Sequence, residues 1–73
     1  MADTPLLSEL NAVVWKIEVT PGDRVREGDT LILLESMKME IPVMAPRDGT
    51  VAVILVEEKQ TVKEGQRLAL LSV

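Results

Sequence analysis

The chain has 73 residues and a formal net charge of −4, and it contains neither cysteine nor histidine. These absences exclude disulfides, thiolate chemistry, zinc sites built on cysteine and a histidine general base, while the acidic charge argues against a nucleic-acid partner. No apolar run reaches membrane-spanning length, and residues 1–7 lack the basic start and long apolar core of a secretion signal. We therefore expect one domain over residues 1–73, cytoplasmic, with no membrane partner, and monomeric on its own.

The composition predicts an all-β fold. Hydrophobic residues make up 47% of the chain, with one Trp and no Phe or Tyr, so the core must be built from Val, Leu and Ile. In chain order, strands are predicted at 13–19, 31–35, 41–44, 50–56 and 68–73. Turns are predicted at 21–23, 27–29 and 64–66, and a tight turn at Asp48-Gly49. Short strands at this spacing predict a small antiparallel sandwich or barrel.

An internal repeat divides the chain into two halves. A shift of 37 positions lays residues 4–36 over 41–73 without a gap, and ten of the 33 aligned pairs are identical, where average composition gives about two. The shared residues are mostly aliphatic, so the repeat indicates a common fold with pseudo-twofold symmetry. In both copies the shared apolar positions step by three and then two, which predicts a β-bulge near residues 15–16 and 52–53.

Two positions depart from the repeat at turns. Asn11-Ala12 stands where the second copy has Asp48-Gly49, and Lys59 stands opposite Gly22. If the first of these turns needs a positive φ, Ala12 costs about 1 kcal/mol relative to glycine.

The link between the two copies carries one lysine between two methionines. Strands on either side, the second kept extended by a proline, make a hairpin with Lys38 exposed near its tip. Met37 and Met39 are expected to fold over the end of the apolar core as flexible fillers. Most surface lysines have no specific role, and only the position of Lys38 on the repeat axis and its methionine neighbours mark it as a candidate.

The segment around this lysine resembles the attachment motif of biotinyl domains, the biotin carboxyl carrier modules of biotin-dependent carboxylases. The motif residues are Glu35, Ser36, Met37, Lys38, Met39 and Glu40. The resemblance extends over essentially the whole chain, including segments 21–23, 25–28, 45–51 and 62–65, and indicates a small stand-alone member of the biotin/lipoyl attachment family. It implies a barrel-sandwich hybrid of two four-stranded antiparallel sheets, with the lysine at one end and both termini at the other.

The resemblance also implies roles for these residues. Lys38 is the residue to which biotin protein ligase attaches biotin, Met37 and Met39 are the flanking motif, and Glu35, Ser36 and Glu40 are recognised by the ligase. Ser36 departs from the alanine often found there, which is a change between two small residues. The biotinyl-lysine arm then shuttles a carboxyl group between biotin carboxylase and carboxyltransferase components, so the chain is expected to be a non-catalytic carrier without a metal.

Two alternatives stay open. A lipoyl carrier, or a dual biotin/lipoate attachment protein, has the same fold, although lipoyl domains usually flank their lysine with Asp and Ala rather than Met. An unmodified structural or adaptor barrel would leave Lys38 without a role. An independent enzyme is the least expected, because no base or metal constellation accompanies the remaining polar residues. Trp15, opposite Ala52 in the repeat, is interpreted as packing on its strand, with a partner contact as the alternative.

Overall fold

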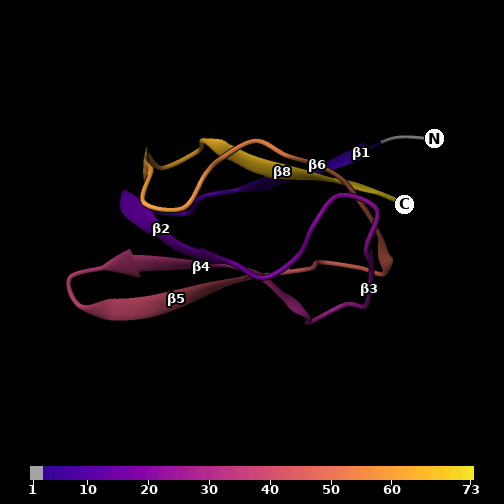
Figure 1. The fold of residues 1–73 in the computed structure, drawn as a ribbon, viewed down its shortest axis with the longest axis horizontal. Coiled ribbons are helices and arrows are strands. Elements are labelled where there is room, and N and C mark those ends of the chain that lie inside the picture. The colour runs from indigo at the N-terminus through magenta and orange to yellow at the C-terminus, as the bar shows by residue number, and fades with distance from the viewer. Residues whose placement is uncertain (1–2) are drawn as a thin grey trace.

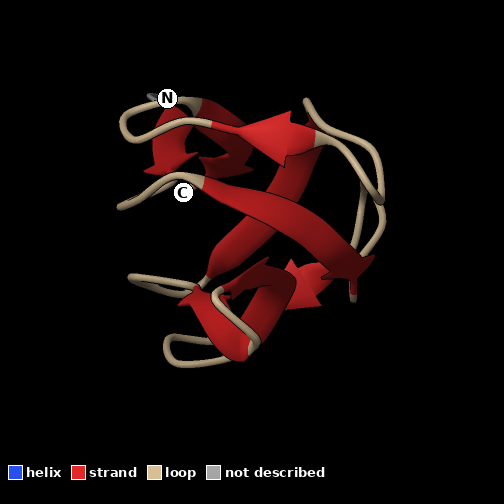
Figure 2. Ribbon diagram, turned by 90° about the vertical axis from the view of Figure 1, so that its left-hand side faces the viewer, coloured by secondary structure: helices blue, strands red, loops and turns tan. Residues whose placement is uncertain are grey.

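The computed structural model describes residues 3–73, and within that range it contains eight strands and no helix. The strands are β1 (Asp3–Leu7), β2 (Ala12–Ile17), β3 (Arg24–Val25), β4 (Thr30–Ser36), β5 (Met39–Met44), β6 (Gly49–Ile54), β7 (Thr61–Val62) and β8 (Arg67–Ser72). They form two antiparallel sheets, which we call sheet A (order β1-β8-β6-β3) and sheet B (order β5-β4-β2-β7). Figure 2 shows the strands in two layers, as a sandwich rather than a closed barrel, which confirms the predicted all-β fold.

The two halves of the chain are related by a pseudo-twofold exchange. Replacing each of β1–β4 by the strand four places later, and the reverse, turns the strand order of sheet A into that of sheet B. Hydrogen bonds between loops repeat in the same way: Gly22 N donates to Val51 O at 2.7 Å, and Lys59 N donates to Val14 O at 2.6 Å. Each half therefore closes on the other, and neither sheet is built from one half alone.

Both predicted β-bulges are confirmed. The register of β2 against β4 shifts between Val14 and Lys16, and that of β6 against β8 shifts between Val51 and Val53. The extra residue in each strand is what turns the alternation of apolar positions from a step of two into a step of three.

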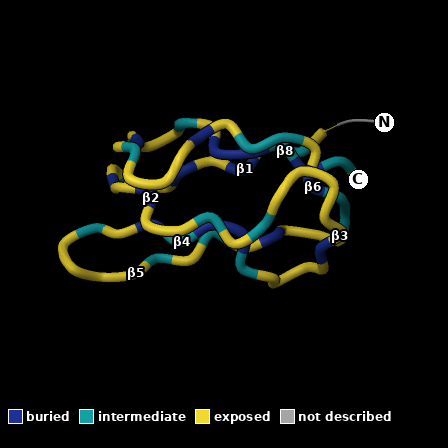
Figure 3. Tube along the Cα trace, in the orientation of Figure 1, coloured by how far each residue is buried: buried dark blue, intermediate teal, exposed yellow. Residues whose placement is uncertain are grey.

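The core lies between the sheets and is aliphatic. Figure 3 shows the buried residues along the inner sides of both layers, while the tip of the β4–β5 hairpin is exposed. The apolar side chains that are almost completely buried come from both halves: Val14, Leu31, Ile32, Leu34, Val51, Val62, Leu68 and Leu71. Each such side chain stabilises the fold by about 1.5–3 kcal/mol relative to exposure. The only buried polar side chain among residues 3–73 is Ser8, whose Oγ donates to Leu10 O at 2.6 Å.

The prediction of a tight turn at Asp48-Gly49 is wrong. Gly49 is the first residue of β6 and has no positive φ, and the backbone bends over residues 46–48 instead. A Cβ on Gly49 would lie 2.6 Å from Ser72 O, so the close approach of β8 is what requires glycine. Ala12 has no positive φ either, and the cost expected there does not arise.

The polar residues that precede Gly49 and Ala12 form hydrogen bonds to turns far away in the sequence. Asp48 Oδ1 accepts a hydrogen bond from Glu27 N at 2.8 Å, and Asn11 Oδ1 accepts one from Glu64 N at 2.9 Å. These four residues are equivalent under the repeat, so each half fastens a turn of the other. Lys59 does adopt a positive φ of 75°, as its repeat partner Gly22 does at 97°.

Candidate functional site

Lys38 lies in a two-residue turn that joins β4 to β5. Ser36 pairs with Met39, which leaves Met37 and Lys38 as the central residues, with φ values of 52° and 68°. Two positive φ values in succession are typical of a type I′ turn, whose twist matches that of the flanking strands. In Figure 1 this turn lies at one end of the molecule and the C-terminus at the other, as the resemblance implied.

The residue types of this turn do not suit its geometry. Type I′ turns favour Asn-Gly or Asp-Gly, because those residues adopt positive φ at little cost. A left-handed conformation costs an ordinary residue about 1–2 kcal/mol, and here two ordinary residues adopt it in succession. The sequence of the tip is therefore not explained by the needs of the hairpin.

The side chains at the tip are exposed. Lys38 is exposed, and Met37 and Met39 are 91% and 64% exposed. The expectation that the methionines fold over the core is wrong, because the core ends before the tip: Leu34 is the last fully buried residue of β4. No core surface lies beneath the turn for a methionine to cover.

Two carboxylates lie beside the lysine on one face of the hairpin. Glu35 and Glu40 are exposed and directly opposite each other across β4 and β5. Like charges in this arrangement destabilise a sheet. Within residues 3–73 the only ion pair is Lys16–Glu18 at 3.6 Å, so neither carboxylate is neutralised by a cation there. Ser36, one residue further toward the tip, is half-buried opposite Met39.

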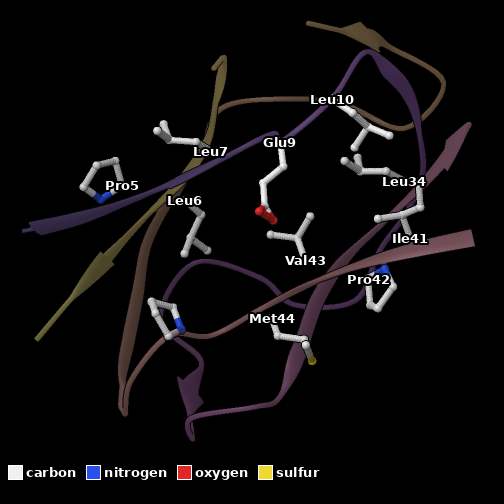
Figure 4. A pocket seen from close by; sticks show the side chains of 11 residues that line it. Pro5, Leu6, Leu7, Glu9, Leu10, Leu34, Ile41, Pro42, Val43 and Met44 are labelled. Atoms are coloured by element: carbon white, nitrogen blue, oxygen red, sulfur yellow. The ribbon is translucent and has the colours of Figure 1, made fainter. Parts of the chain in front are cut away.

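A groove of about 400 Å³ runs between the edge strands β1 and β5. Its walls are mainly apolar, and Figure 4 shows the Glu9 side chain directed toward Val43. Sequence reasoning missed this groove, because its two walls belong to different halves of the repeat and no local pattern links them. We will refer to it as the β1–β5 groove.

Residues 3–73 offer neither a metal site nor a membrane-spanning helix. They contain no cluster of three or more acidic, histidine or cysteine side chains able to hold a metal ion. No helix capable of crossing a membrane occurs in the same range.

Comparison with known proteins identifies the family. The family model described as "Biotin-requiring enzyme" matches residues 3–71. A "Biotinylated protein TB7.3 homolog" of Mycobacterium leprae is 42% identical over 65 residues, which cover 89% of this chain and 92% of that protein. A "Biotin/lipoyl attachment protein" of Bacillus subtilis is 44% identical over 59 residues, 81% of each chain.

A solved structure agrees with this assignment. The urea carboxylase of Kluyveromyces lactis contains a region that matches 97% of this chain with a TM-score of 0.91 and 34% identity, and that region is 6% of the carboxylase chain. The chain therefore belongs to the biotin/lipoyl family of biotin-requiring carrier domains, the family that residues 35–40 predicted.

Proposed function

We propose that residues 1–73 form one carrier domain in which Lys38 is biotinylated, and that the biotinyl-lysine arm carries a carboxyl group between biotin carboxylase and carboxyltransferase sites. The observation that carries the proposal is the turn itself: an exposed lysine at the end of a hairpin that extends past the core. The names of relatives support it, since one is described as biotinylated and another is a urea carboxylase.

The residues present fit covalent attachment of biotin. The amine of Lys38 stands clear of the core, so an acyl group can be added without displacing packed side chains. Biotin protein ligase would bring biotinyl-adenylate, Lys38 Nζ would attack its acyl carbon, and AMP would leave as the amide forms. When attached, biotin supplies the ureido nitrogen that accepts and releases the carboxyl group. The hairpin holds the arm at the end of the molecule, and the carrier itself is assigned no catalytic step.

The residues around Lys38 have a recognition role in this proposal. Glu35 and Glu40 offer the ligase two adjacent carboxylates without a cation partner in the described part of the chain. Met37 and Met39 offer exposed, adaptable apolar contacts, and the small Ser36 leaves the hairpin backbone accessible. Recognition by the ligase would explain why the chain keeps the like-charge pair and the strained turn, which both destabilise the fold.

A second candidate is dual attachment of biotin and lipoate. The relative from Bacillus subtilis is described as a biotin/lipoyl attachment protein, and it is 44% identical over 81% of this chain. A lipoyl group would use the same amine and the same hairpin.

The test is intact-mass analysis with site mapping after co-expression with biotin protein ligase, and separately with lipoate ligase. We expect one biotin per chain, on Lys38. Lys38→Arg should remain folded by circular dichroism and carry none, while Lys63→Arg, a matched change at another exposed lysine, should be modified as the wild type is. A lipoyl adduct in the second arm would establish dual attachment. Absence of any adduct on Lys38 would overturn the proposal.

A further inference from the structure

The outer faces of the two sheets can be compared residue by residue, because the repeat places equivalent positions in the same register. One cross-strand row of sheet B runs through Glu40, Glu35, Val13 and Thr61. The equivalent row of sheet A runs through Asp3, Ser72, Thr50 and Arg24. The same row of backbone positions thus occurs in both sheets with different side chains. Sheet A therefore shows which side chains are sufficient for this row to fold.

A second row shows the same contrast. In sheet B, Leu33 pairs with Pro42 on one side and Lys16 on the other, and Trp15 is the extra residue of the bulge. In sheet A the equivalent positions hold Leu70, Pro5, Val53 and Ala52. The proline and the leucine are common to both sheets. The large aromatic residue is found in sheet B alone.

Folding does not account for these differences. Trp15 is 48% exposed, and Val13 is 38% exposed, so both leave much apolar surface in water. Glu35 and Glu40 repel each other, whereas sheet A has no acidic pair at the equivalent positions. Sheet A forms the same bulge and register with Ala52, Thr50 and Ser72. We name Val13, Trp15, Leu33, Glu35 and Glu40 the Trp15 face.

We propose that the Trp15 face is the surface on which biotin protein ligase docks when it modifies Lys38, an inference that rests on the proposed function. The ligase surface that fits it is apolar opposite Trp15 and carries Arg or Lys opposite the Glu35–Glu40 pair. Exposed tryptophans at the centre of an interface commonly contribute most of its affinity. The two carboxylates fix orientation and speed association with a basic surface.

The dimensions agree with one continuous contact. Leu33, which lies beside Lys16 and the bulged Trp15, is five residues from Lys38, or about 17 Å along the strand. A protein–protein interface of ordinary size covers about 800 Å² on each partner, which is a patch wide enough to include both the lysine and the tryptophan. Sheet A lies on the opposite side of the sandwich, so a ligase seated on the Trp15 face does not reach its outer surface.

The first experiment measures initial rates of biotinylation by biotin protein ligase at saturating ATP and biotin, with the carrier concentration varied. Trp15→Ala installs the residue that sheet A has at this position, and we expect KM for the carrier to rise about tenfold with kcat unchanged, as is typical of an interface anchor. Leu55→Ala removes a side chain of matched exposure, 47% against 48%, after β6. Met44→Ala alters the β1–β5 groove. Both controls should keep the wild-type KM.

A second measurement leaves the Trp15 face unchanged. The chain has one tryptophan, so biosynthetic labelling with 5-fluorotryptophan gives a single fluorine NMR signal, from Trp15. Addition of ligase should shift or broaden that signal in the Lys38→Arg carrier, which binds without being modified. A wild-type KM for Trp15→Ala, a rise in KM for Met44→Ala in its place, or an unchanged fluorine signal at ligase concentrations above KM would each overturn the docking face. None of these results touches the proposed function, which fails only if wild-type Lys38 receives no biotin.

Discussion

The turn at Lys38 and the four turns in the body of the molecule follow different rules. Each body turn is closed by a side chain that accepts a hydrogen bond from a backbone amide three residues earlier. The accepting residues are Asp23, Asp29, Gln60 and Gln66. Three of the four turns also place a glycine at the positive φ. In these turns, the residue types match the geometry.

The turn at Lys38 has neither device. Its two positive-φ positions hold Met37 and Lys38, and no side-chain hydrogen bond among residues 3–73 closes it. Its shape is imposed by the register of β4 and β5, and its residue types are set by something other than folding. Residues that contradict their local geometry are common at functional sites, where another requirement outweighs the strain. The contrast separates what the scaffold needs from what the site needs.

Lys38→Arg should have the largest effect on function and almost none on the fold. We expect complete loss of biotin incorporation, with a free energy of unfolding within about 0.5 kcal/mol of the wild type, because an exposed surface change away from packing is nearly neutral. Intact mass and urea denaturation measure the two quantities. Residual biotin on the variant would show that the amine at the tip is not the sole acceptor.

Gly49→Ala should have the opposite effect, a loss of stability, because it changes the body of the molecule and has no contact with the tip. The new Cβ would meet Ser72 O at 2.6 Å and the Leu71 side chain at 3.1 Å, so β8 must move. We expect the free energy of unfolding to fall by about 1–3 kcal/mol, as for other overpacked sites, as measured by urea denaturation. Ala52→Gly, at an exposed position of the same strand, is the control and should cost less than about 1 kcal/mol. Equal losses for both variants would contradict the close-approach explanation.

The double variant Met37→Asn, Lys38→Gly gives the tip the residues its turn prefers. Relief of two unfavourable conformations should raise the free energy of unfolding by about 1–2 kcal/mol, while biotinylation is lost. Thermal and urea unfolding measure the gain, with Met39→Ala, outside the turn, as the control. A double variant no more stable than the wild type would show that Met37 and Lys38 adopt this turn without strain.

Lys59→Gly should have the smallest effect. Lys59 has the one positive φ of the body turns that is not held by glycine. Release of about 1–2 kcal/mol of strain is partly offset by the greater freedom of glycine in the unfolded chain, which leaves a gain of about 0.5 kcal/mol. A loss of stability would contradict the view that this position follows the same rule as Gly22. Biotinylation should be unaffected.

Much of the fold could be predicted because the two copies of the repeat could be compared with each other. The steps of three and two in the shared apolar positions located both bulges, at Trp15 and at Ala52. The buried leucines of β4 and of its copy β8 follow directly from the aliphatic pattern. The exposed position of Lys38 also followed, since the segment between two copies must join two strands.

What could not be predicted depends on contacts between distant segments. The role of Gly49 comes from β8 passing close to it, and that of Asp48 from a hydrogen bond to the turn at Glu27. The methionines were misplaced because local sequence does not show where a core ends, and here it ends at Leu34. The β1–β5 groove was missed for the same reason, as its walls meet only in the folded chain.

The left-handed turn at Met37 and Lys38 determines when an enzyme can recognise this segment. A free peptide with this sequence rarely adopts two such conformations in succession, and an isolated two-stranded hairpin is marginal in water. An enzyme that requires this corner must therefore wait until both halves have assembled around β4 and β5. Under the proposed function, biotin would be attached only to folded copies of the chain, and misfolded copies would stay unmodified.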